Sequence, residues 1–191
     1  MDIAADVFLE TERLVLRRFT MADEDNLFEL DGDPDVMRYI TGGLATPRAE
    51  LRDDYLPAYL NYYRRYPGYG FWATEEKSSG QFIGWFHLRP GPDDAADVAE
   101  LGYRLRKSAW GKGYATEGAR ALIDKAFTEF GMRRVYALTM SVNTRSRRVM
   151  EQSGLRLIRT FHLDWPYRIE GEEFGDVEYA QTKDEWAAER S

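Results

Sequence analysis

Apolar side chains along this chain follow two different spacings, which divide it into expected strands and helices. Alternating apolar and polar residues, or short apolar runs between turn residues, predict strands. Apolar residues that recur at steps of three and four predict amphipathic helices. The pattern predicts about seven strands, at residues 14–19, 70–74, 82–89, 100–105, 134–140, 155–163 and 177–182. The expected helices are 22–30, a short turn at 36–40, 47–65, 115–130 and 144–153.

The order of these elements indicates an α/β fold of mixed α+β character. Helices are frequent near the front, an antiparallel meander follows, and the chain closes with the order β-α-β-α-β-β. This order predicts a mixed, mostly antiparallel sheet with helices on both faces. No repeat, linker or low-complexity tract interrupts the 191 residues. We therefore expect a single domain over residues 1–191.

Composition narrows the class of protein. The chain is 43% hydrophobic and 31% charged, and no apolar stretch reaches membrane length. Residues 1–6 lack the basic start of a signal peptide, so we expect a cytoplasmic protein with no membrane partner. A net charge of −7 argues against nucleic-acid binding and favours a cationic partner such as an amine. With no cysteine and only two histidines, we expect no disulfide, no thiol nucleophile and no metal site.

A glycine-containing turn follows the expected strand at 100–105 and precedes a helix. Gly111 and Gly113 let the backbone approach a ligand closely. The first N–H groups of a helix lack intrahelical partners and lie at the positive end of its dipole, so this turn predicts a phosphate site. It is not a Walker loop, because Arg106 and Gly113 stand where the first glycine and the hydroxyl should be. The Rossmann fingerprint also fails, because Thr116 replaces the third glycine.

Two motifs resemble those of the GNAT superfamily of N-acyltransferases. Trp110-x-x-Gly113-x-Ala115 is similar to its Gln/Arg-x-x-Gly-x-Gly/Ala acyl-CoA loop. Residues 143–155 read Asn-Thr-Arg-Ser-Arg-Arg-Val-Met-Glu-Gln-Ser-Gly-Leu and resemble the family's Asn-x-x-Ser/Ala...Glu-Lys-x-Gly-Phe segment. The Trp-Gly-x-Gly-Tyr-Ala form of the loop and segments near both ends are similar to the ribosomal-protein Ser/Ala N-acetyltransferase-like branch. The resemblance covers roughly residues 10–186.

This resemblance implies a GNAT fold that binds acetyl-CoA as co-substrate and an amine as acceptor. In that family the strand before the loop and the strand after the helix run parallel and splay apart, with the pantetheine arm between them. The Asn143 amide would bind the pantetheine, although Asn before Thr is also an ordinary N-cap. The residues that would face the cofactor amides through their backbones are Tyr103, Arg104 and Leu105. The residues expected around the diphosphate are Gly111, Lys112, Gly113, Tyr114, Ala115 and Thr116.

A basic cluster stands on the helix expected at 144–153. Its members are Arg145, Arg147 and Arg148, and Lys112 adds a cation in the loop. Cations in these places suit the phosphates of the cofactor, and we assign Arg148 and Lys112 to that role. The alternative reading is a solvated helix face.

N-acetylation requires a proton acceptor for the amine, a polarised thioester carbonyl and a hydrogen-bond donor for the leaving thiolate. Glu100 stands at the family position for the base; the alternative is a solvated strand-end glutamate. A backbone N–H near Tyr103 to Leu105 would polarise the carbonyl. Many family members place a leaving-group Tyr seven positions after the Asn, but Met150 stands there. Ser146 would instead donate to the thiolate, or simply cap its helix.

The acceptor is the least specified part of the sequence. Residues 55–72 are rich in aromatics and lie where the family places a substrate-gating helix; single rings there either line a pocket or pack in the core. Phe86, His87 and Trp165 are further pocket candidates. The expected activity is direct acetyl transfer to a protein N-terminal Ser/Ala or a small amine, since no Cys is available for an acyl-enzyme. The alternative is a non-catalytic acetyl-CoA sensor or an interaction module on a GNAT scaffold, and the sequence leaves open whether the chain forms a homodimer.

Overall fold

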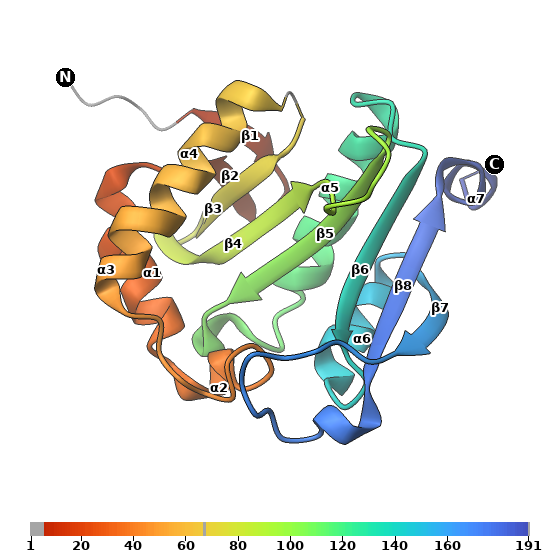
Figure 1. Cartoon of the computed structure of the whole chain (residues 1–191). Helices are drawn as coiled ribbons and strands as arrows, with labels where there is room; N and C mark the ends of the chain where they lie inside the picture. The colour runs from red at the N-terminus through yellow and green to blue at the C-terminus, as the bar shows by residue number, and fades with distance from the viewer. Residues whose placement is uncertain (1–5, 67, 191) are drawn as a thin grey trace.

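The computed structural model describes residues 6–66 and 68–190, so most of the segment used to judge a signal peptide, residues 1–5, lies outside the described residues. The described chain forms an eight-stranded open sheet in the order β1-β2-β3-β4-β5-β6-β8-β7 (Figure 1). All neighbouring strands are antiparallel except β5 and β6, which run parallel. The strands are β1 (Val7–Glu10), β2 (Leu14–Arg18), β3 (Gly70–Glu76), β4 (Gln81–Arg89), β5 (Val98–Leu105), β6 (Arg134–Met140), β7 (Arg156–Phe161) and β8 (Asp176–Thr182).

Helices cover both faces of this sheet (Figure 1). One face carries α5 (Tyr114–Thr128) and α6 (Thr144–Gln152), and the other carries α1 (Glu24–Asp31) and α4 (Leu56–Arg65). The remaining helical segments are η1 (Met21–Asp23), α2 (Pro34–Met37), α3 (Arg48–Glu50), η2 (Leu51–Tyr55), η3 (Lys107–Ala109), η4 (Glu172–Phe174) and α7 (Lys183–Ala188). The mixed fold expected from the element order is confirmed.

Among the strands and α-helices, the sequence pattern misses two short ones, β1 and α7. β1 has four residues and pairs only with β2, so its alternation of apolar and polar residues is too short to predict a strand. Its Phe8 ring stacks on Trp72 at 4.0 Å between ring centroids. α7 follows β8 without a break, with Thr182 and Glu185 forming a capping box. The sheet therefore has eight strands rather than about seven. The helix expected at 47–65 is present as α3, the π-helical turn η2 and α4 in succession.

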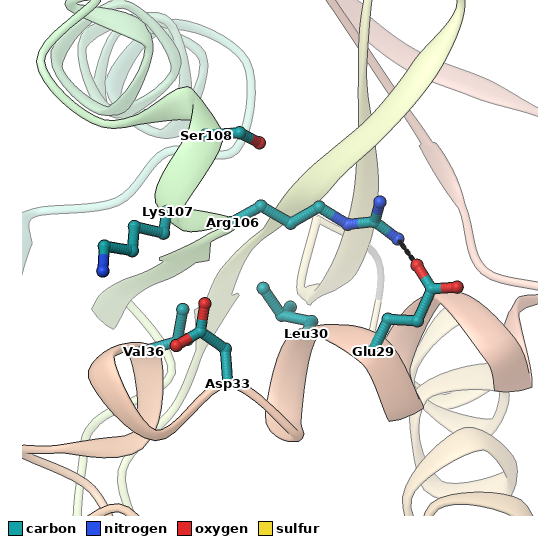
Figure 2. Close-up of a pocket in the computed structure, with 7 residues that line it drawn as sticks. All are labelled: Glu29, Leu30, Asp33, Val36, Arg106, Lys107 and Ser108. Carbon is teal, nitrogen blue, oxygen red and sulfur yellow. Dashed lines mark hydrogen bonds and ion pairs between the residues drawn. The ribbon is translucent and has the colours of Figure 1, made fainter.

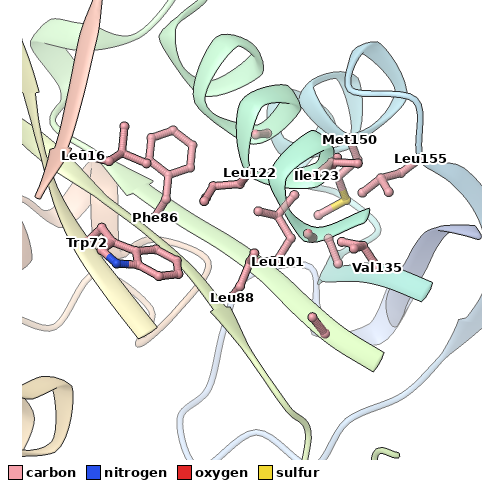
Figure 3. Close-up of a cluster of buried hydrophobic side chains, with 14 of the residues drawn as sticks. Leu16, Trp72, Phe86, Leu88, Leu101, Leu122, Ile123, Val135, Met150 and Leu155 are labelled. Carbon is pink, nitrogen blue, oxygen red and sulfur yellow. The ribbon is translucent and has the colours of Figure 1, made fainter. Parts of the chain in front are cut away.

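The main core lies between the sheet and the α5–α6 layer, and Figure 3 shows its centre. Phe86 of β4 is fully buried there, directly beneath Gly118 of α5. A Cβ on Gly118 would lie 2.3 Å from Cζ of Phe86, so this glycine lets the helix approach the strand. Met150 of α6 belongs to the same core. Phe86 is therefore a core residue, and its assignment to an acceptor pocket is wrong.

The sheet opens between β5 and β6. Their parallel pairing runs from Val98 and Arg134 only to Glu100 and Tyr136. Beyond that point β5 stays paired with β4 as far as Leu105, and β6 stays paired with β8 to its end. The two halves of the sheet therefore diverge beyond Glu100, and the unpaired strand edges face each other across a wedge-shaped opening. α5 begins just past the end of β5, and α6 just past the end of β6.

Candidate active site

The loop between β5 and α5 presents a row of backbone N–H groups. Gly111 and Gly113 have φ angles of +73° and +82°, left-handed values that favour glycine, and Gly113 is the N-cap of α5. No side chain caps this helix. Within the described chain, no backbone hydrogen bond uses the N–H groups of residues 111–116. The loop therefore has the geometry that an anion site requires, with free donors at the positive end of a 15-residue helix.

Side chains around the loop hold its shape. Arg13, just before β2, donates to the Lys112 carbonyl oxygen at 2.9 Å and pairs with Glu117 at 2.6 Å. The Tyr114 phenol donates to the Glu76 carboxylate and is buried, so only the backbone of Tyr114 can face a ligand. Lys112 Nζ lies 6.0 Å from the Tyr114 ring centroid. The loop is thus fastened to β2 and β3 from behind while its N–H groups stay free.

One side of α6 faces this loop. Its first-turn Arg145 lies over the Trp110 ring at 4.9 Å, and its last residue, Gln152, accepts from Thr116 at 3.2 Å. Arg148 lies between them at helical spacing, is exposed, and has no ion pair with any described residue. Arg147 differs, because its guanidinium donates to the Tyr179 hydroxyl and to a backbone carbonyl. Of the three arginines, Arg145 and Arg148 are thus the two placed toward the loop of residues 111–116.

Asn143 and Ser146 stand at the start of α6, beside the opening. Asn143 Oδ1 accepts from the Ser146 N–H at 3.3 Å, and Asn143 Nδ2 donates to Thr139 at 3.1 Å. The ordinary N-cap role is therefore present, and the second amide hydrogen of Asn143 is left for a ligand. The Ser146 hydroxyl lies 3.0 Å from the phenol oxygen of Tyr103 on β5. Sequence reasoning gave Tyr103 only a backbone role and missed this contact.

Glu100 lies at the apex of the opening, on the face of β5 opposite Tyr103. Its side chain is 16% exposed, and Oε2 lies 3.1 Å from Arg89 Nη2 on β4. Burial opposes ionisation, but His87 and Arg89 outweigh it, and the pKa of Glu100 lies below its usual value. Because burial lowers the pKa of His87 and keeps its ring neutral, we attribute this effect to Arg89. Glu100 is an ionised, partly enclosed carboxylate, not a solvated strand end.

His87 of β4 lies beside Glu100 and is enclosed by neighbouring side chains. Its ring lies directly over Gly102, where a Cβ would come within 2.3 Å of His87 Cε1. The rings of Phe71 and Trp85 enclose it, with centroids 4.8 and 5.6 Å away. Its Nε2 is 3.8 Å from Glu100 Oε1, too far for a hydrogen bond. Neither ring nitrogen has a hydrogen-bond partner among the described residues. Gly102 in the Glu-Leu-Gly-Tyr motif leaves room for this ring.

A hollow of about 240 Å³ lies between η3 and the α1–α2 segment, near the end of β5 (Figure 2). Arg106 spans it to Glu29 at 2.8 Å, and Lys107 pairs with Asp35. Arg104 points to the same helical layer and pairs with buried Asp31 at 2.5 Å. The Arg104 side chain is therefore engaged within the protein, so only its backbone is left for a ligand.

A second hollow, of about 460 Å³, lies at the other end of β5. It is lined by Tyr62, Tyr66, Tyr69, Pro90, Gly91, Pro92, Asp94 and Ala96. Asp94 accepts from Tyr136, the residue opposite Glu100 in the register. Tyr59 is different, being 7% exposed and stacked on Phe71 at 4.1 Å. The aromatic segment 55–72 thus divides into core and surface rings; its Pro67 lies outside the described residues.

Residues 6–66 and 68–190 show neither a metal-ligand cluster nor a membrane-spanning helix. Those residues contain no group of three or more His, Cys, Asp or Glu side chains placed to hold a metal ion. None of their helices has the length and apolarity to cross a bilayer.

Comparison with known proteins gives the family. A model of the acetyltransferase (GNAT) domain matches residues 13–156. FsC-acetyl coenzyme A-N(2)-transacetylase from Aspergillus fumigatus is 34% identical over 195 aligned residues, which span 97% of this chain and 80% of that protein. YkkB of Bacillus subtilis is 35% identical over 80% of this chain and 87% of its own length.

Solved structures share the fold. A GNAT-family acetyltransferase from Bacillus anthracis superimposes with a TM-score of 0.75 at 26% identity, over 93% of this chain and 99% of that one. RimL, a ribosomal L7/L12 alpha-N-protein acetyltransferase in complex with coenzyme A, has a TM-score of 0.76 over 93% of this chain and 98% of its own. At 18% identity it shows a shared fold alone, so the ribosomal-protein branch is not confirmed. By its family match and its relatives, the chain belongs to the GNAT acetyltransferases and is an acyl-CoA-dependent acetyltransferase.

Proposed function

We propose that this enzyme transfers the acetyl group of acetyl-CoA to a primary amine, by direct attack while both substrates are bound. The observation that carries the proposal is the opening of the sheet beyond Glu100. One end of that opening meets the free N–H groups of the loop, and its apex holds a carboxylate. A long anionic thioester fits this arrangement, with phosphates at the loop and the reacting carbon near the apex.

The groups that would hold the co-substrate follow from this placement. The N–H groups of residues 111–116 face the diphosphate, and Lys112 and Arg148 supply cations beside it. The unpaired edge of β5 at Tyr103, Arg104 and Leu105 offers backbone donors and acceptors to the amides of the arm. The free amide hydrogen of Asn143 adds a donor from the other side.

The reaction needs a deprotonated amine. Glu100 is ionised well below neutral pH, so it is ready to attract an ammonium group and accept its proton, directly or through a water molecule. A backbone N–H of β5 in the segment 103–105 polarises the thioester carbonyl. The amine nitrogen bonds to the carbonyl carbon and loses its second proton to water, the carbon–sulfur bond breaks, and the thiolate accepts a hydrogen bond from Ser146.

For the acceptor we propose a small-molecule amine ahead of a protein N-terminal Ser or Ala. The hollow lined by Tyr62, Tyr66 and Tyr69 has a volume of about 460 Å³, within the range of small-ligand pockets. Its rings and Asp94 suit an organic cation, and the net charge of −7 favours one. The relative from Aspergillus fumigatus is named as a transacetylase acting at a nitrogen, N(2).

The test is thiol release from acetyl-CoA with a panel of acceptors: polyamines, aminoglycosides, amino-acid amines, and peptides beginning with Ser or Ala. We expect release with at least one small amine, together with an acceptor heavier by one acetyl group. Release only with the peptides would overturn the small-molecule proposal and support the protein N-terminus. No release with any acceptor, while acetyl-CoA still binds in calorimetry, would support the non-catalytic sensor instead.

A further inference from the structure

Two hydroxyl groups meet across the opening of the sheet. The phenol oxygen of Tyr103 lies 3.0 Å from Ser146 Oγ and 3.1 Å from the Ser146 carbonyl oxygen. Tyr103 stands three residues past Glu100 on β5, where pairing with β6 has ended. Ser146 lies in the first turn of α6, which follows β6. The pair thus joins the two diverging halves of the sheet where the thioester would lie.

No tyrosine stands where it could donate from the second turn of α6. Met150 is at that place, 2% exposed, and packed in the main core with Val135 and Leu155 (Figure 3). The phenol that lies at the start of α6 is instead that of Tyr103, on β5. We propose that Tyr103 is a positioning residue for the leaving thiolate and acts through Ser146; this rests on the proposed acetyl transfer.

The hydrogen bonds allow two arrangements. In one, the Tyr103 hydroxyl donates to the Ser146 carbonyl oxygen and the Ser146 hydroxyl donates to the Tyr103 oxygen. In the other, the Tyr103 hydroxyl donates to Ser146 Oγ, which frees the Ser146 hydrogen to point at the sulfur. Rotation of the two hydroxyls converts one arrangement into the other without leaving either oxygen unpaired. The second arrangement suits the moment when the carbon–sulfur bond breaks and negative charge collects on sulfur.

Burial decides that Tyr103 donates a hydrogen bond rather than its proton. Burial raises the pKa of the Tyr103 phenol, outweighing the hydrogen bond to Ser146, and its ring faces Phe86 at 6.0 Å. No charged side chain of the described residues contributes to this shift. A buried phenolate is therefore unfavourable. The departing thiolate takes its final proton from solvent after release, and Tyr103 and Ser146 stabilise its charge until then.

The proton acceptor for the amine and the hydrogen-bond donors for the thiolate lie on opposite faces of β5. Glu100 projects toward His87 and Arg89, whereas Tyr103 projects toward α6. The proton taken from the amine is thus collected on one face, and the thiolate is stabilised on the other. This separation keeps Glu100 from accepting the hydrogen bonds that Tyr103 and Ser146 would give to the thiolate.

The test compares Tyr103→Phe, Ser146→Ala and the double variant in steady-state acetyl transfer. We expect Tyr103→Phe to lower kcat about tenfold, the effect of losing one orienting hydrogen bond, with an unchanged dissociation constant for acetyl-CoA. In the Ser146→Ala background, Tyr103→Phe should have no further effect, because its target is gone. An unchanged kcat in Tyr103→Phe, or an equal loss in both backgrounds, would overturn the proposal. Absence of transfer by the wild type would instead refute the proposed function.

A second tyrosine, Tyr179, provides a matched control. Tyr179 of β8 is more deeply buried than Tyr103, and its phenol also bonds to α6, through Arg147 and Glu151, but it lies outside the opening. Tyr179→Phe should therefore retain wild-type kcat.

If Tyr103→Phe does not fold, a fluorinated tyrosine at position 103 keeps the ring and acidifies the phenol. Its kcat should then fall at a lower pH than in the wild type as the phenol ionises. A pH profile identical to that of the wild type would count against the proposal.

Discussion

Replacing Gly113 with valine should lower the stability of the protein slightly and its affinity for acetyl-CoA strongly. A Cβ at this position would meet only Arg13 Nη2, at 3.3 Å, the movable end of a half-exposed side chain. The valine side chain therefore has room, and the loss of folding stability comes from the φ angle of +82°. A left-handed conformation costs a non-glycine residue about 1–2 kcal/mol, and more when the residue is β-branched. The protein should stay folded with a modestly lower melting temperature.

The effect on acetyl-CoA should be larger. Relaxing the introduced valine to a negative φ angle turns the loop N–H groups away from their common direction. A hydrogen bond to a charged group contributes about 1.5–3 kcal/mol, so the loss of two weakens binding by about 3–6 kcal/mol. That corresponds to an affinity about 10²- to 10⁴-fold lower. Isothermal titration calorimetry measures it, alongside a thermal melt.

Gly80→Val is the matched control. Gly80 has a φ angle of +66° in the β3–β4 turn, and a Cβ added there would have no other atom within 4 Å. It should lose a similar amount of stability and keep wild-type affinity for acetyl-CoA. Wild-type affinity in Gly113→Val, or an equal loss of affinity in Gly80→Val, would refute the assignment of the loop.

Three further outcomes are expected at other positions. Gly102→Ala places a Cβ 2.3 Å from the enclosed His87 ring and should cost about 1–3 kcal/mol in urea unfolding; an unchanged midpoint would contradict the stacked arrangement. Burial opposes ionisation of Glu178, but its two arginine partners outweigh it and hold its pKa below the usual value. Its contribution to stability is therefore full above about pH 4.3 and is lost as pH falls through the lowered pKa, so Glu178→Gln should flatten the acid limb of a stability profile. Arg148→Gln should weaken acetyl-CoA binding in a salt-dependent way, whereas Arg147→Gln should mainly lower the melting temperature.

The sequence predicts those parts of the molecule that depend on local spacing. β6 occurs at the expected residues 134–140, and α5 begins within one residue of its expected start. The shape of the loop before α5 is also local, because the two glycines and the helix that follows them are adjacent in the chain. β1 escapes prediction since four residues carry too little alternation, and its place depends on pairing with β2.

The polar surroundings of Glu100 could not be predicted, because they depend on register between strands. His87 and Gly102 are partners in the β4–β5 ladder, and further along that ladder Arg89 comes opposite Glu100. Nothing in the spacing of residues 81–105 fixes that register to one residue. The contact between Tyr103 and Ser146 likewise requires the position of α6 relative to β5, which only the folded chain provides.

The role of Glu100 as the base is tested by comparing Glu100→Gln with Glu178→Gln in thiol release from acetyl-CoA, with the best acceptor of the panel. Both are largely buried strand glutamates paired with arginine, but only Glu100 lies at the apex of the opening. We expect Glu100→Gln to lower kcat about 10²- to 10⁴-fold while acetyl-CoA binds normally, and Glu178→Gln to keep wild-type kcat. Wild-type kcat in Glu100→Gln would contradict the assignment of Glu100 as the base.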